Sequence, residues 1–139
     1  MTITVRLVRR GHRKSCVVTT AQDVANLLGP TARGLDREHF WCISLDARHA
    51  VIALELVSIG TLTAALVHPR EVYKGALLAN AASVIVAHNH PSNDRSPSPE
   101  DRETTRRLKE AGAILGVPLL DHVVLGGAGY YSFRESGLL

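Results

Sequence analysis

The hydrophobic positions of this chain fall into short runs separated by polar, glycine or proline residues, a pattern that predicts strands alternating with helices. One run, residues 83–87 (SVIVA), is wholly apolar and rich in β-branched side chains, which is typical of a buried central strand. The other runs predict strands over residues 39–45, 50–57, 62–67, 119–125 and 130–133. Residues 46–49 would form the hairpin loop between the first two.

Helices are expected where apolar residues recur between start and stop signals. Three segments satisfy this condition, residues 20–28, 69–80 and 99–115. Gly29-Pro30 would end the first helix, and Gly116 would end the third. The order of these elements predicts an α/β (α+β) domain in which helices flank a mixed β-sheet.

The composition is that of one folded domain. The chain has 139 residues, of which 45% are hydrophobic and 21% charged, so a packed core is expected across residues 1–139, with 1–20 as a candidate N-terminal extension. No apolar run reaches the roughly 18 residues that a membrane span needs. The N-terminus lacks the apolar segment of a signal peptide, which makes the cytoplasm the expected location. Cys16 and Cys42 form no metal or disulfide pattern and are expected to be buried thiols.

The charge balance is mildly basic, with a formal net charge of +3. Its densest part is a basic run at residues 9–14, RRGHRK. Such a run permits contact with nucleic acid, but a solvated edge or loop explains it equally well and is the favoured interpretation.

The strongest chemical signal is a spaced set of four residues, His88, His90, Ser98 and Asp101. The two histidines follow the buried strand and lie two residues apart, so in an extended chain their rings point to the same side. Asp101 would add a carboxylate from the first turn of the next helix. Two imidazoles and one carboxylate are the protein ligands of a catalytic zinc site that leaves a fourth position open for water. We therefore expect Zn²⁺ bound by His88, His90 and Asp101.

A zinc hydrolase also needs a general base that is not a ligand. Strand alternation would place Glu55 on one face with Val51, Ala53 and Val57, and a carboxylate among apolar neighbours is costly unless it is paired or functional. Partial burial would raise its pKa and suit it to proton transfer. Glu55 is thus the expected base, and Ser98 would donate a hydrogen bond to the oxyanion.

Each assignment has a structural alternative. Ser98 and Asp101 also match the N-cap and the third position of a helix, and this capping does not exclude metal binding. An isolated His-x-His is more often incidental than a metal site. His122 is expected in the core or behind the metal ligands, and Asp121-His122 orienting a ligand histidine is the less favoured alternative.

Several other classes of site find no support. The tripeptide His88-Asn89-His90 does not reproduce the nuclease motif that shares its letters, because the key residues of that motif are spread over a longer stretch. The chain has no G-x-S-x-G elbow of a serine hydrolase. It also lacks both common glycine-rich nucleotide-binding motifs.

The segments VHPREV, AHNHPS, PSPED, LLDH and YSFRESGLL resemble the RadC-like branch of the JAB/MPN (JAMM) family, from about residue 21 to residue 139. The resemblance implies an MPN fold with a curved mixed sheet. It also implies a zinc site made by His88, His90 and Asp101, with Ser98 and Glu55 at the remaining motif positions. Asn93 stands where this branch usually has glycine, and asparagine tolerates the left-handed backbone region better than most residues. The N-terminal helix-hairpin-helix region usual in RadC proteins is absent from this sequence.

Two functions remain open at this point. The first is a zinc-dependent metallopeptidase or isopeptidase that cleaves an amide bond in a protein or peptide, as relatives in the JAMM family do. The second is a DNA repair-associated accessory module with a structural or vestigial metal, which the basic pI, the basic run and the customary label of RadC proteins support. The complete ligand set favours the enzyme.

Overall fold

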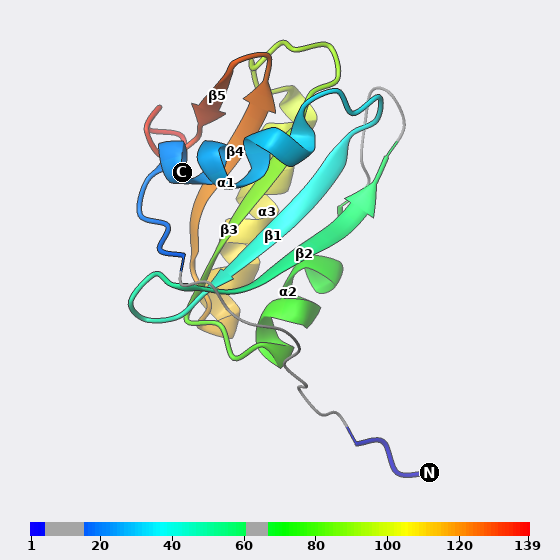
Figure 1. Ribbon diagram of the computed structural model, residues 1–139. Coiled ribbons are helices and arrows are strands. Elements are labelled where there is room, and N and C mark those ends of the chain that lie inside the picture. The colour runs from blue at the N-terminus through cyan, green and yellow to red at the C-terminus, as the bar shows by residue number, and fades with distance from the viewer. Residues whose placement is uncertain (5–15, 61–66) are drawn as a thin grey trace.

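The computed structural model describes residues 1–4, 16–60 and 67–139 (Figure 1). The described residues form a five-stranded sheet and three helices. The strands are β1 (His39–Leu45), β2 (Val51–Ile59), β3 (Ser83–Asn89), β4 (Leu119–Gly126) and β5 (Gly129–Ser132). The helices are α1 (Ala21–Ala32), α2 (Pro69–Leu78) and α3 (Pro99–Leu115). These elements confirm the expected α/β class, while the basic run and nearly all of the strand expected at 62–67 lie outside the described residues.

The sheet is mixed, with the strand order β2-β1-β3-β4-β5. Strands β3 and β4 are parallel and are joined through α3, whereas the other neighbouring pairs are antiparallel. Strand β3 is therefore central and fully buried, as its apolar run predicted. The register pairs Phe40 of β1 with His88 of β3, so the residues just before β1 lie beside the residues just after β3.

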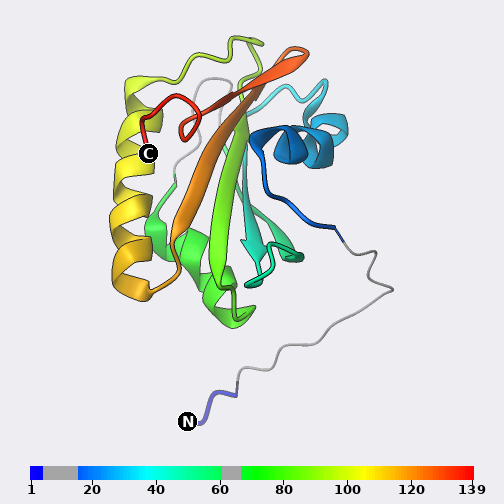
Figure 2. The ribbon, with the colours of Figure 1, turned by 90° about the vertical axis from the view of Figure 1, so that its left-hand side faces the viewer.

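Helices cover both faces of the sheet (Figure 2). Helix α1 packs on one face over β4 and β5, and its apolar residues join Trp41, Ile43 and Ile85 in one core. Helices α2 and α3 border the other face, where Phe40, Cys42 and further apolar residues form a second core. Adjacent residues of β1 point alternately into the two cores, which explains why nearly the whole strand is apolar.

Helix α1 runs past the expected stop at Gly29-Pro30 and ends at Ala32, so that predicted boundary is wrong. Pro30 removes one backbone donor near the helix end, yet the Arg33 N–H still reaches the Gly29 carbonyl at 3.0 Å. At the other end, Thr20 and Asp23 form a reciprocal capping box that fixes the start of the helix.

The two cysteines differ in exposure. Cys42 is buried as predicted, and burial followed by the nearby charge of Glu55 raises the pKa of its thiol to about 12. Cys16 is only half-buried, so the prediction fails for it. Neither is in a disulfide. Across the ranges that the structure describes, no helix combines the length and apolar character needed to cross a membrane.

Candidate metal centre

The His88 and His90 rings meet just beyond the buried part of β3. His88 is the next-to-last residue of the strand and is 2% exposed, and His90 follows the strand directly. Their Nε2 atoms lie 3.0 Å apart. The expected juxtaposition of two imidazole nitrogens is therefore present.

Asp101 lies in the first turn of α3, whose N-terminus is held at the same edge of the sheet. Its Oδ1 atom is 3.2 Å from Nε2 of His88, and its Oδ2 atom is 3.1 Å from Nε2 of His90. The structure thus brings the carboxylate to both histidines. The Ser98 backbone N–H donates to the same Oδ2 at 2.9 Å, which fixes the orientation of the carboxylate.

A second carboxylate, that of Glu38, enters from the start of β1. Because β1 runs antiparallel to β3, the residue two positions before Phe40 lies beside the residue two positions after His88. The Oε1 atom of Glu38 is 3.5 Å from Nε2 of His90, and the side chain of Glu38 is largely buried. One ligand atom each from Glu38, His88 and His90 lies within 4.8 Å of the others, a group that could hold a metal ion.

Asn89 fixes the chain on either side of Glu38. Its Oδ1 accepts from the His39 N–H at 2.6 Å, and its Nδ2 donates to the Arg37 carbonyl at 2.9 Å. The backbone of Glu38 is held as well, because its carbonyl accepts from the Gly60 N–H at 2.8 Å. These bonds leave the Glu38 carboxylate facing the histidines.

A chain of hydrogen bonds behind His88 sets which ring nitrogens carry protons. The Thr105 hydroxyl lies 2.7 Å from the Asp101 carbonyl, which can only accept, so the hydroxyl hydrogen points there. Its oxygen then accepts from Nδ1–H of His122 at 2.6 Å, which leaves Nε2 of a neutral His122 as an acceptor. Burial first, and the neighbouring His88 second, hold the pKa of His122 well below its usual value, so this ring stays neutral.

The Nε2 atoms of His88 and His90 carry lone pairs that face the centre of the site. His88 Nδ1–H donates to His122 Nε2 at 2.7 Å, and His90 Nδ1–H donates to the Asp94 carbonyl at 2.7 Å. In the neutral rings, both Nε2 atoms therefore carry lone pairs, and they face each other and the oxygens of Asp101. Two lone pairs and an anion at this spacing require a shared cation, either a proton or a metal ion. The donor set fits zinc, which takes imidazole nitrogen and carboxylate oxygen.

The pKa shifts agree with a site built for a cation. Burial alone would raise the pKa of Asp101, but hydrogen bonds with His88 and His90, the charge of His88 and the Ser98 N–H outweigh it and hold that pKa well below its usual range. The hydrogen bond to Asp101 raises the pKa of His90, and burial opposes this only in part. In the metal-free protein, a proton on His90 would therefore occupy the place of the cation.

Ser98 lies at the N-cap of α3, as its structural alternative predicted. Its Oγ accepts from the Asp101 N–H at 3.0 Å, and the Asp101 carboxylate accepts from the Ser98 N–H, a complete capping box. The cap and the metal centre share one carboxylate.

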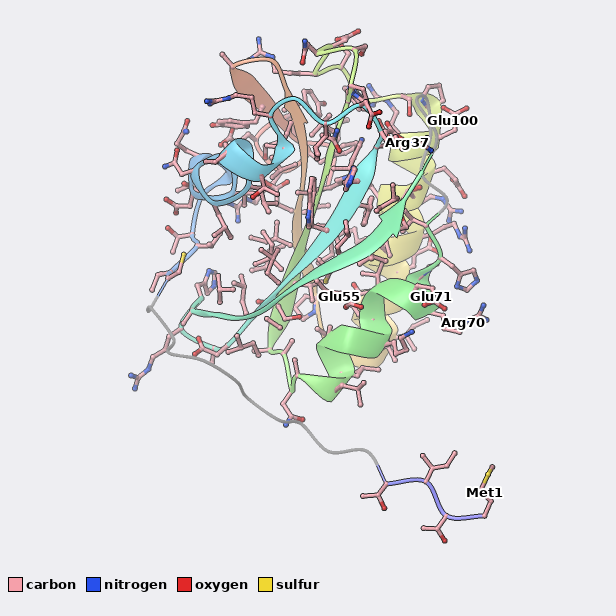
Figure 3. All side chains as sticks on the ribbon, turned by 45° about the vertical axis from the view of Figure 1, so that its right-hand side comes forward. Met1, Arg37, Glu55, Arg70, Glu71 and Glu100 are labelled. Atoms are coloured by element: carbon pink, nitrogen blue, oxygen red, sulfur yellow. The ribbon has the colours of Figure 1, made fainter. Side chains whose placement is uncertain are left out.

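Glu55 lies elsewhere, which corrects its assignment as the base beside the metal. Glu55 is on β2 and pairs with Cys42 of β1, so it lies two strands across and two residues along from His88. At ordinary sheet spacings the Cα atoms of Glu55 and His88 are about 12 Å apart. Its carboxylate lies against Gly75 of α2, where a Cβ would collide with it. Figure 3 shows Glu55 beside α2 near Glu71, far from Arg37 and Glu100, the sequence neighbours of Glu38 and Asp101. Its pKa is raised, first by burial, as expected, but without access to the histidines.

Sequence reasoning missed two residues of this centre. Glu38 carried a usable signal, since it directly precedes the strand at 39–45, and a carboxylate at a strand end can reach the neighbouring strand's end. Thr105 carried none, because a threonine inside a helix is ordinary. His122 was expected in the core or behind the metal ligands, and the structure shows it fully buried and hydrogen-bonded to His88. Asp121 bonds Ser132 Oγ and backbone N–H groups rather than the imidazole of His122.

Comparisons with known proteins agree with this architecture. The chain is 50% identical over 123 residues to a UPF0758 protein of Rubrobacter xylanophilus, covering 88% of this chain and 54% of the relative. It is 56% identical over 116 residues to one of Symbiobacterium thermophilum, covering 84% and 50%. The chain thus spans about half the length of these curated relatives. The family model described as the RadC-like JAB domain matches residues 18–138, and the mixed sheet flanked by helices is consistent with a JAB/MPN-like fold. The chain therefore belongs to the RadC-like JAB domain family.

Proposed function

We propose that this domain is a zinc-dependent hydrolase that cleaves an amide bond in a protein or peptide. The observation that carries the proposal is the convergence of two Nε2 lone pairs, 3.0 Å apart, on carboxylate oxygens. In the metal-free protein a proton on His90 can bridge these groups, whereas a zinc ion would engage both nitrogens and the carboxylate at once. Membership of the RadC-like JAB domain family supports the same function.

We assign the zinc ligands to His88, His90 and Asp101, and the base to Glu38. Asp101 approaches both histidines at 3.1–3.2 Å and is held by a helix cap, whereas Glu38 lies 3.5 Å from His90 and within 4.8 Å of His88. A rigid carboxylate near both rings suits a ligand, and a carboxylate at the margin suits proton transfer. This assignment moves the base from Glu55 to Glu38.

The residues of the chain then have defined tasks. Zinc bound there would lower the pKa of a water molecule toward about 7 and polarise a substrate carbonyl. Glu38 takes the proton that the attacking water loses and delivers it to the leaving nitrogen, so that a C–O bond forms and the C–N bond breaks. The Ser98 hydroxyl, whose oxygen already accepts from Asp101 N–H, turns its hydrogen toward the carbonyl oxygen as that atom gains charge.

The proposal is tested first by metal content. Protein stripped with a chelator, incubated with zinc and desalted should retain about one zinc per chain. His90→Asn and Asp101→Asn should retain far less. His49→Asn is the matched control, because His49 lies in the distant β1–β2 hairpin loop and has a positive φ that asparagine accepts. Failure of the unaltered protein to retain zinc would refute the proposal.

The main residue-level support for the DNA-associated alternative, the basic run at 9–14, lies outside the described residues. A DNA titration over a range of salt concentrations still separates the two functions, because affinity that falls steeply with salt and survives loss of the zinc ligands would favour the alternative.

A further inference from the structure

A groove of about 1080 Å³ leads away from the metal centre. Its inner end is formed by Asn89, His90 and Pro91. One wall is formed by α1, with lining residues from Gln22 to Ala32, and by residues 33–35, and the other is the β4–β5 hairpin with the loop at 91–95. A ligand lying in this groove would contact His90, a residue of the candidate metal centre.

Arg95 is placed in this groove by a loop tied to the metal site. The loop begins at His90, whose carbonyl accepts from the Asn93 N–H at 2.9 Å and whose Nδ1 donates to the Asp94 carbonyl. Asn93 has a φ of 65°, as its position in the family predicted, and its Oδ1 accepts from the Gly127 N–H at 3.3 Å. The loop thus connects His90 to the β4–β5 turn.

The hairpin in turn is shaped to receive the Arg95 side chain. A Cβ at Gly126 would approach Arg95 Cγ within 2.9 Å, and one at Gly129 would collide with the Arg95 guanidinium. Glycine at these two positions lets the arginine lie along the hairpin. Neither glycine has a positive φ, so the structure explains both by the space that they leave, which is taken by Arg95 at both positions and also by the Asn93 backbone at Gly126, where the Asn93 oxygen would lie 3.0 Å from a Cβ.

The positive charge of the groove is not neutralised within the part of the chain that the structure describes. Within that part, neither the guanidinium of Arg33 nor that of Arg95 takes part in an ion pair or a side-chain hydrogen bond, and the one lining carboxylate, Glu135, accepts from the Tyr130 hydroxyl at 3.3 Å. Two fork-shaped donors facing one groove suit carboxylate ligands.

We propose that this groove binds a carboxylate-bearing segment of a peptide substrate through Arg33 and Arg95 and guides the chain to His90. The assignment of the peptide as substrate rests on the proposed function, whereas the binding itself does not need zinc. Ala25, Leu35 and Tyr130 give the groove apolar contacts that suit a polypeptide better than a phosphate backbone. The carboxylate belongs either to acidic side chains or to a C-terminus.

The test measures binding by fluorescence anisotropy on metal-free protein, so that zinc cannot itself hold the carboxylate. The probes are labelled peptides of alternating Glu and Ala and matched peptides with Gln in place of Glu, each with a free and with an amidated C-terminus. We expect acidic peptides to bind about fivefold to tenfold tighter than their Gln counterparts, with a preference that shrinks as salt is added. Loss of preference on amidation identifies the C-terminus as the source, and dependence on Glu identifies the side chains.

Arg33→Gln and Arg95→Gln should each reduce the preference about threefold, and the double variant should abolish it. Gly129→Ala should act like Arg95→Gln, because the added methyl group displaces only the end of a flexible side chain. Arg107→Gln is the matched control, because it removes the same charge from α3, outside the groove, and it should keep the preference.

Equal binding of Glu and Gln peptides, or a preference that survives in the double variant, would overturn the proposal. So would a labelled DNA oligonucleotide that binds more tightly than the acidic peptides with the same dependence on both arginines. Because every measurement is made without zinc, loss of the peptide preference and loss of the hydrolytic function are separate results.

Discussion

Nδ1 of His88 lies 2.7 Å from Nε2 of His122, and this contact directs the other nitrogen of His88 toward Asp101. Thr105 sets the direction of this hydrogen bond. Its hydroxyl donates to the Asp101 carbonyl, and its oxygen accepts from Nδ1–H of His122, which leaves Nε2 of His122 as the acceptor for His88. A threonine one helical turn beyond Asp101 thus controls the tautomer of His88, a proposed metal ligand on β3.

This relay makes Thr105→Val a specific test. Valine keeps the shape and burial of the side chain but removes the acceptor for His122, so the His88 lone pair is no longer fixed toward the metal. Zinc affinity should fall by about 10- to 100-fold, as when hydrogen-bond partners of ligand histidines are lost elsewhere. Competition with a chromophoric chelator measures it. Thr104→Val, one residue away and not hydrogen-bonded to His88, His122 or Asp101, should bind zinc normally, and equal effects of both variants would contradict the relay.

Glu38 and Glu55 give a second, paired prediction. Glu38→Gln should lower the rate of hydrolysis by a factor of about 100 or more, because the proton acceptor is lost, while zinc stays bound. Glu55→Gln should leave both unchanged, because this carboxylate lies against α2. Cleavage of a mixed peptide library by zinc-loaded protein, followed by mass spectrometry, provides the measurement. If Glu55→Gln alone stopped turnover, the register argument for Glu38 would be wrong.

Zinc stabilisation should increase with pH. The pKa of His90 is raised above its usual 6.5, so in metal-free protein its proton contributes stability at low pH that is lost as pH rises through the raised value. Zinc must displace that proton, and its effect therefore grows over the same range. With zinc at about 100 times its Kd, the added stability is about 2.7 kcal/mol, which raises Tm by several degrees.

Thermal unfolding with and without zinc, from about pH 6 to pH 8, measures this linkage. The difference in Tm should widen toward high pH and then level off. Asp101→Asn serves as the control, since it removes the anion that raises the pKa of His90 and also removes a proposed ligand. A zinc-induced shift that stayed constant across the range would show that no histidine proton is displaced.

The two cysteines should differ in reactivity. An aromatic disulfide reagent added to native protein near neutral pH should titrate Cys16 and leave Cys42 unmodified, because burial raises the pKa of Cys42 to about 12 and blocks access. Both thiols should react in denaturant. Cys16→Ser should leave native protein with almost no fast-reacting thiol, and rapid reaction of Cys42 would mean that the β1–β2 edge opens readily.

The sequence alone was enough for the elements that depend on local pattern. The apolar run at 83–87 predicted a central strand, and the spacing of His88, His90 and Asp101 predicted a cluster, because the chain between them folds as a strand end, a loop and a capped helix turn. The boundary of α1 was missed because backbone bonding and packing on the sheet carry the helix past Pro30.

Which carboxylate faces the histidines was decided only by tertiary structure. Glu38 and Glu55 both flank or lie within predicted strands, and local sequence does not distinguish them. The strand order β2-β1-β3 and the pairing of Phe40 with His88 bring Glu38 to the metal centre and leave Glu55 two strands away under α2. The relay from Thr105 to His88 likewise joins α3, β4 and β3, and strand register and helix docking are set by the packing of the whole core rather than by neighbours in the chain.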